Sequence, residues 1–225
     1  MKPGVLDESR AREEICRVGK SLFERGYVHA TAGNISVRLD DGFLITPTDA
    51  CLGFLDPAAL ARLDGEGRQL SGAPASKTMA LHAAIYRAAI QFDPATGCII
   101  HTHSTHSVAL SLQCQGPELL APITPYFVMK VGHVPLVGYQ RPGAAATAEE
   151  VAQLVAHHGR NGHPIRAVML QRLGPNVWHD TPATAMAVLE ELEETARLTL
   201  LAAAGCEPLT ELQIDELRRA FGARW

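Results

Sequence analysis

The sequence has no apolar run long enough to cross a lipid bilayer, and its first seven residues lack the apolar core of a secretory signal peptide. Its five cysteines are an odd number, are scattered and form no Cys-x-x-Cys pair, which argues against a disulfide framework and for a reducing compartment. The formal net charge is -4, so the chain lacks the excess of positive charge that is typical of nucleic-acid-binding proteins. We therefore expect a cytoplasmic protein with neither nucleic acid nor a membrane as a partner.

The 225 residues, 47% of them hydrophobic, contain no low-complexity linker and no internal repeat. Apolar periodicity and turn residues predict alternating helices and strands, which favours one α/β domain over residues 1–225. The predicted helices are 7–25, capped by Asp7 or Ser9, and then 78–89, 104–112, 183–203 and 209–221. The predicted strands are 34–39, 43–46, 98–102, 134–137 and 167–170.

The most informative stretch is His101-Thr102-His103, which follows a β-branched apolar run. If that run is a strand, residues at positions i and i+2 point to the same face. Two imidazoles side by side can bind one divalent metal, and neutral imidazole suits zinc. His101 and His103 are therefore candidate metal ligands at the end of a buried strand.

Three polar loops precede this pair and could together hold a phosphate. The first runs through Thr31, Gly33 and Asn34, where glycine allows backbone N–H groups to approach a ligand closely. The second contains Thr48. The third, Ser76-Lys77, opens a helix, where free N–H groups and a lysine favour an anion.

The order of these motifs, with a late helix carrying the acidic run 190–194, resembles the class II aldolase family, which includes the adducin head. The resemblance covers about residues 10–205. It implies a three-layer α/β/α sandwich around a central, mostly antiparallel sheet. It also implies a homotetramer with active sites between subunits, and one divalent metal ion such as zinc.

Within that family the chain looks most like the 3-oxo-tetronate 4-phosphate decarboxylases, because of Ser76-Lys77, the segment 124–132 and the run 141–143 (Arg-Pro-Gly). This implies a metal-dependent carbon–carbon lyase that converts a 3-oxo sugar acid phosphate into a triose ketone phosphate and CO2. The resemblance implies that the metal lies on the two histidines and acts as a Lewis acid. The resemblance implies that the phosphate is bound by Thr31, Gly33, Asn34, Thr48, Ser76 and Lys77. It implies catalytic positions at Lys77, Thr78 and Tyr126. The tyrosine would reach the active site of a neighbouring subunit.

Two residues depart from the family pattern. Thr78 stands where the family has a catalytic glutamate, and a hydroxyl is far too weak an acid–base group to replace it. Leu173 stands where the family has its third metal histidine, whereas catalytic zinc sites usually have three protein ligands. Decarboxylation suffers less from the first change than aldol cleavage does, because it needs no base to remove a hydroxyl proton before the carbon–carbon bond breaks.

Three explanations of these departures stay open. His29, His106, His133 or Asp49 could complete the metal site, the substrate could supply the missing oxygens, or catalysis could be lost, as in the adducin head. A sugar-phosphate aldolase or epimerase is the alternative enzyme, and an assembly module is the non-enzymatic one. Outside these positions, we expect His82 to be a packed core residue, and the acidic run 190–194 to be a solvated helix face.

Overall fold

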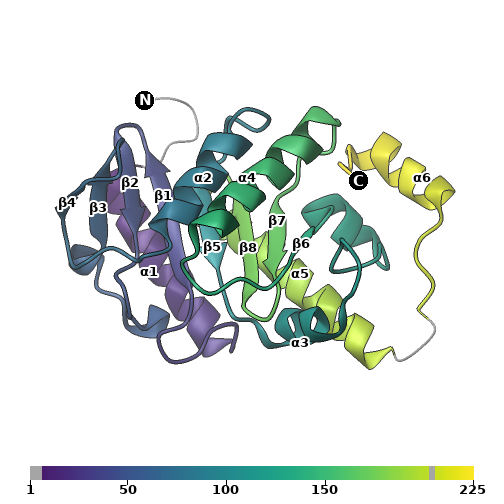
Figure 1. The fold of residues 1–225 in the computed structure, drawn as a ribbon, viewed down its shortest axis with the longest axis horizontal. Helices are drawn as coiled ribbons and strands as arrows, with labels where there is room; N and C mark the ends of the chain where they lie inside the picture. Colours follow the sequence, from purple (N-terminus) through teal and green to yellow (C-terminus); the bar gives the residue numbers. More distant parts are fainter. Residues whose placement is uncertain (1–6, 203–205) are drawn as a thin grey trace.

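A computed structural model describes residues 7–202 and 206–225 of the chain. An eight-stranded sheet, in the order β4-β3-β2-β1-β5-β8-β7-β6, forms its centre (Figure 1). Every neighbouring pair is antiparallel except β6 and β7, which are parallel. The strands are β1 (Asn34–Leu39), β2 (Gly42–Ile45), β3 (Ala61–Asp64), β4 (Gln69–Ser71), β5 (Cys98–His101), β6 (Leu136–Val137), β7 (Ala167–Leu170) and β8 (Gly174–His179).

Helices cover both faces of this sheet. On one face α2 and α4 lie side by side, and on the other α5 packs against α1, α3 and the central strands (Figure 1). The chain therefore has the expected three-layer α/β/α architecture with a mostly antiparallel sheet. The helices are α1 (Glu8–Glu24), α2 (Met79–Ala89), α3 (Thr105–Gln113), α4 (Ala145–Arg160), α5 (Pro182–Leu201) and α6 (Glu211–Phe221), with short helical turns η1 (Leu52–Phe54), η2 (Pro57–Ala59) and η3 (Phe127–Val131).

The alternation of side chains along β1 shows how the sequence forms a separate core on each face of the sheet. Ile35 and Val37 point to one face and join the core beneath α1 and α5. Ser36 points to the opposite face, where its hydroxyl bonds to His82 and Tyr86 of α2. The face beneath α2 is therefore apolar toward α4 and polar where β1 meets β5, and this polar part adjoins the site.

Most predicted elements are present within a few residues of the expected bounds. Asp7, and not Ser9, caps α1 by accepting a hydrogen bond from the backbone N–H of Arg10. The expected end of the late helix at residue 203 lies outside the described residues. Of the described strands and longer helices, β3, β4, α4 and β8 were not predicted, and neither were the short turns η1, η2 and η3.

α6 is joined to the rest of the fold mainly through η3. Of its residues, Ile214 is the buried one. None of the described helices is both long enough and apolar enough to span a membrane.

Candidate functional site

The three predicted phosphate loops come together at one end of the central strands. The backbone N–H of Ile35 donates to the hydroxyl of Thr46 over 3.2 Å, which ties the Gly33-Asn34 turn to the loop after β2. That second loop is tied to the third, because Thr48 N–H donates to Pro74 O and Ser76 N–H donates to Thr46 O. Loops far apart in the sequence are thus held together by hydrogen bonds that their backbone N–H groups donate.

Gly33 holds the first turn against the end of β5. Its φ of +84° lies in the left-handed region, and a Cβ at this position would lie 2.8 Å from the carbonyl oxygen of His101. Glycine is required here both by the conformation and by the close approach. Asn34, the next residue, pairs directly with His101 across the sheet, so both side chains point to the same face.

His101 is the last residue of β5 and is 4% exposed. Its Nδ1 lies 2.9 Å from the carbonyl oxygen of Pro175. Because a carbonyl can only accept, Nδ1 carries the proton and Nε2 presents a lone pair. Burial, with a smaller contribution from His103, lowers the pKa of His101 to about 4, so the ring is neutral at pH 7.

His103 lies beside His101, but not for the reason that the sequence indicated. The strand ends at His101, so His103 belongs to the turn before α3 and not to a shared strand face. The two rings nevertheless lie with their centroids 5.0 Å apart at an angle of 67°. Burial, and then the nearby His29, lowers the pKa of His103.

Glu193 fixes the start of α3 directly after this histidine pair. Its carboxylate is 6% exposed and accepts hydrogen bonds from the backbone N–H groups of His106 and Ser107. The Ser107 hydroxyl and His106 Nδ1 lie 2.6 Å and 2.8 Å from the same carboxylate. The prediction that the acidic run 190–194 is a solvated face is wrong for Glu193, because a carboxylate satisfies the free N–H groups of a helix N-terminus.

His82 is a packed core residue, as expected. It is fully buried, its Nδ1 lies 2.8 Å from the Ser36 hydroxyl, and its Nε2 has no hydrogen-bond partner among the described residues. Burial, and then the nearby His101, lowers the pKa of His82 to about 3. The unfolded chain therefore binds more protons than the folded chain as the pH falls below about 6.5.

We expect the free energy of unfolding to fall as the pH is lowered from 7 to 5. His82 alone should account for about 2 kcal/mol of this loss, because its folded pKa lies below its unfolded one. Urea unfolding of a His82→Gln variant should show a pH dependence weaker by about that amount. The exposed His157 provides the matched control, His157→Gln, which should keep the native pH dependence. An unchanged pH dependence in His82→Gln would contradict the assignment.

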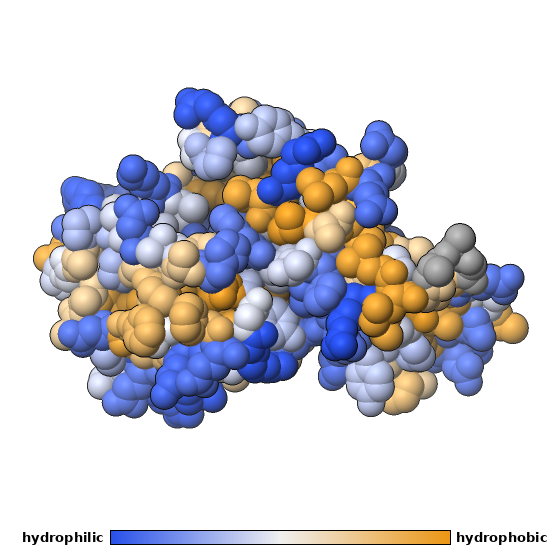
Figure 2. Space-filling model, turned by 90° about the horizontal axis from the view of Figure 1, so that it is seen from below, coloured by the Kyte–Doolittle hydropathy of each residue, from blue (hydrophilic) through white to orange (hydrophobic). Residues whose placement is uncertain are grey.

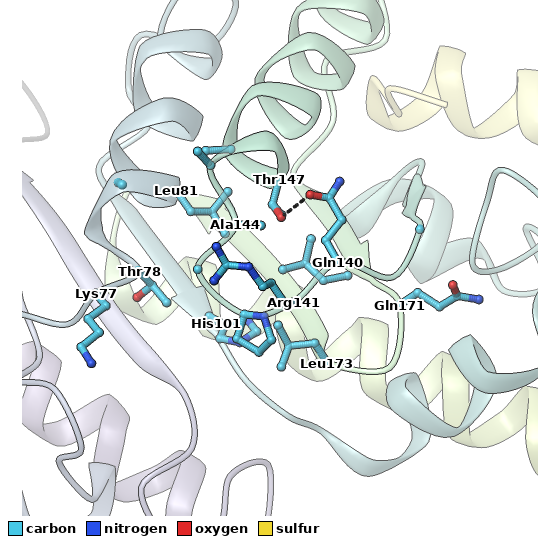
Figure 3. A pocket seen from close by; sticks show the side chains of 17 residues that line it. Lys77, Thr78, Leu81, His101, Gln140, Arg141, Ala144, Thr147, Gln171 and Leu173 are labelled. Atoms are coloured by element: carbon cyan, nitrogen blue, oxygen red, sulfur yellow. Dashed lines mark hydrogen bonds between the residues drawn. The ribbon is translucent and has the colours of Figure 1, made fainter.

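A pocket of about 200 Å³ opens beside His101 (Figure 3). Its walls come from the start of α2, the end of β5, the segment 138–144, the start of α4 and the turn between β7 and β8. Lys77 and Thr78 line it at the α2 side, and Leu173 lines it next to His101. None of the 17 lining residues is an aspartate or a glutamate.

The donors around His101 do not fit a metal centre with three protein ligands. His101 Nε2 and His103 offer two imidazoles, while Leu173 and Thr78 occupy the positions at which the resemblance implies a third histidine and a glutamate. Across residues 7–202 and 206–225, no group of three or more His, Cys, Asp or Glu side chains is arranged to hold a metal ion. The pair is therefore at most a two-ligand site.

None of the candidates for completing the metal site forms a group of three possible ligands with the histidine pair among the described residues. The ring centroid of His29 lies 6.3 Å from that of His103. His106 is bonded to Glu193. His133 stacks on Trp225 with centroids 4.2 Å apart, and Asp49 is exposed.

Other predicted site residues lie at the margin or outside the pocket. Thr31 is exposed in the turn before β1, and the Ser76 hydroxyl bonds to that of Thr78 at 2.8 Å. Tyr126 is 62% exposed just before η3 and is not among the residues that line the pocket. Within one chain, therefore, the structure does not bring Tyr126 to His101.

Two residues of this region were not singled out as site residues from the sequence. Arg141 projects across the pocket above His101 (Figure 3). Asn176 is fully buried, pairs with His101 across the sheet, and has no partner for either amide atom among the described residues. The Arg141-Pro142-Gly143 run was a visible signal for the arginine, whereas Asn176 lies in a strand that was not predicted.

The fold and the pocket define an α/β protein with a pocket at the end of its central strands. The chain belongs to the family described as Class II Aldolase and Adducin N-terminal domain, whose model matches residues 13–200. Membership in this family implies a divalent metal, a requirement that the donor set here meets only in part.

Relatives with curated names resemble the chain over nearly its whole length. It is 50% identical to the 3-oxo-tetronate 4-phosphate decarboxylase of Cupriavidus necator, over 97% of this chain and 99% of that protein. It is 42% identical to the protein of the same name from Escherichia coli, over 94% and 96%. The crystal structure of YgbL from Escherichia coli, described as a putative aldolase/epimerase/decarboxylase, matches with a TM-score of 0.85 and 40% identity, covering 94% of this chain and 99% of that one.

Proposed function

We propose that the chain decarboxylates a 3-oxo-tetronate 4-phosphate to a triose ketone phosphate and CO2. The observation that carries the proposal is a pocket next to His101 that is lined by Lys77 and Arg141 but by no carboxylate. Such a pocket suits a substrate with anionic groups and lacks the base that aldol cleavage requires. The names of the relatives at 50% and 42% identity support the same reaction.

In this proposal the phosphate lies among the three joined loops, held by Thr31, Gly33, Asn34, Thr48, Ser76 and Lys77. The carbon–carbon bond to the carboxyl carbon breaks, CO2 leaves, and the electron pair moves onto the 3-oxo oxygen to form an enediolate. A proton is then added to carbon. His101 Nε2 is unprotonated and can only accept a hydrogen bond in the resting state, so the proton comes from water or from Tyr126.

We also propose that His101 and His103 bind one divalent ion, zinc by the preference of imidazole, but more weakly than a three-ligand centre does. Only these two histidines are available as protein ligands among the described residues. No step of the reaction is therefore assigned to this ion.

The remaining features of the proposal concern assembly and location. We propose one domain over residues 1–225 that forms a homotetramer in the cytoplasm, with Tyr126 presented to the pocket of a neighbouring copy. Figure 2 shows apolar surface in several patches on the lower face of the molecule. Large exposed apolar side chains of α5 and α6 are available for such contacts, namely Leu198, Leu201, Leu212 and Phe221.

The test is CO2 release from a 3-oxo-tetronate 4-phosphate by the purified protein, with the triose ketone phosphate measured in parallel. We expect both products in equal amounts, and little cleavage of a ketose 1-phosphate. The exposed His157→Gln variant is the control for preparation quality, and it should have native activity. Cleavage of the ketose phosphate without CO2 release would favour the aldolase alternative.

The substitutions at positions 78 and 173 favour one further candidate, a ligand-binding or assembly module without turnover. This candidate predicts neither CO2 release nor aldol cleavage, although a phosphorylated ligand could still bind. Turnover of either substrate therefore excludes it.

A further inference from the structure

Besides Lys77, the cation that lines the pocket is Arg141. No hydrogen bond or ion pair of the Arg141 side chain occurs among the described residues, and the residue is exposed. Figure 3 shows its side chain crossing the pocket above His101 toward Thr78, with Lys77 at the far edge. The guanidinium therefore lies over the buried imidazole of His101 (Figure 3).

The segment that carries Arg141 is held in place. The hydroxyl of Thr147 donates to Gln140 Oε1 over 2.9 Å, and Gln140 Nε2 donates to a carboxylate oxygen of Glu150 over 2.7 Å. The N–H of Ala144 donates to the carbonyl oxygen of Arg141. These contacts fix the arginine backbone against the first turns of α4.

The surroundings of Arg141 favour negative charge. The first turns of α2 and α4 both line the pocket, and neither helix has a side-chain cap at its N-terminus. Free N–H groups at two helix N-termini add to the charges of Lys77 and Arg141. The buried His101, 4% exposed, lies below Arg141 in Figure 3.

We propose that Arg141 binds the carboxylate of the substrate and so selects sugar acid phosphates over neutral sugar phosphates; this rests on the function proposed above. A guanidinium pairs with a carboxylate through two parallel hydrogen bonds. With the phosphate at Lys77, a substrate with anions at both ends spans the pocket and its 3-oxo carbon lies near His101. Arg141 is thus a binding residue that determines specificity.

The contact acts on binding more than on the chemical step. The carboxylate loses its charge as CO2 forms, so an arginine that pairs with it stabilises the bound substrate more than the transition state. Replacing Arg141 should therefore raise KM without lowering kcat.

The test uses ligands that cannot react. A tetronate 4-phosphate, which has a hydroxyl in place of the 3-oxo group, is compared by calorimetry with the tetritol 4-phosphate that lacks the carboxylate. Arg141→Gln should weaken the acid by on the order of 30- to 100-fold and leave the alcohol unchanged. Arg141→Lys should fall between, because an ammonium is a point charge. The control is Arg172→Gln, which removes the charge of an exposed arginine that does not line the pocket. It should leave the affinities for both ligands unchanged.

Equal weakening of the acid and the alcohol in Arg141→Gln would overturn the proposal, because the arginine would then contact the phosphate or the pocket structure. A fall in kcat at unchanged KM would also overturn it. Because neither binding ligand reacts, preference for the acid is measurable even if no CO2 is released, so failure of the proposed function is distinguished from failure of this inference.

Discussion

Replacing Thr78 by glutamate and Leu173 by histidine together should raise the affinity of the protein for zinc by about 100-fold, equivalent to about 3 kcal/mol. Both side chains line the pocket beside His101. The change adds one imidazole and one carboxylate to the two imidazoles already present, which rebuilds a four-ligand site. Zinc titration against a chromophoric chelator measures the affinity, and metal analysis gives the stoichiometry.

Two further variants make this result specific. His101→Ala/His103→Ala should hold less metal than the native chain. Leu212→His, an extra imidazole on exposed α6, should leave the zinc affinity unchanged. If the native chain already binds zinc tightly and the double replacement changes nothing, other residues complete the coordination, with His29 the first to examine because of its proximity to His103. The native chain should also show little aldolase activity, because no carboxylate lines the pocket.

Lys77→Ala should weaken phosphorylated ligands by about 10- to 150-fold, the effect of losing a charged hydrogen bond that contributes roughly 1.5–3 kcal/mol. Lys77 lies just before the start of α2, which has no side-chain cap. Its neighbour Ser76 donates a backbone hydrogen bond to Thr46 in the loop after β2. The measurement is calorimetric binding of a tetronate 4-phosphate and of the same tetronate without phosphate.

The comparison between the two ligands is decisive, because the unphosphorylated tetronate keeps the carboxylate. Its binding should change little in Lys77→Ala. Lys20→Ala, on the exposed surface of α1, is the matched loss of one lysine and should affect neither ligand. Equal weakening of both ligands by Lys77→Ala would show that the lysine does not hold the phosphate.

Local signals in the sequence were sufficient for the elements that carry the motifs. α1 follows from its apolar period and the Asp7 cap, and β1 and β2 follow from their alternation around a turn, because capping, periodicity and turn chemistry act over a few residues. The same locality explains why His82 could be assigned to the core of α2. The order of short motifs was enough to identify the family.

Long-range pairing decided what local signals could not. β8 lies between β5 and β7 and has a proline and a buried asparagine in its sequence, so its strand character arises from its neighbours. Its pairing with β5 also buries Asn176 beside His101. The burial of Glu193 depends on the docking of α3 onto α5.

By itself, the sequence determined the family, the layers of the fold, the histidine pair and the two replaced positions, because each depends on residue identity or on a short period. Only the tertiary structure decided that three loops share hydrogen bonds, that the histidines meet through a turn, and that Arg141 crosses a pocket without a carboxylate. These outcomes depend on which segments, far apart along the chain, come into contact. No local sequence pattern predicts these contacts, because the free energy that stabilises them comes from all the strands and helices that pack together.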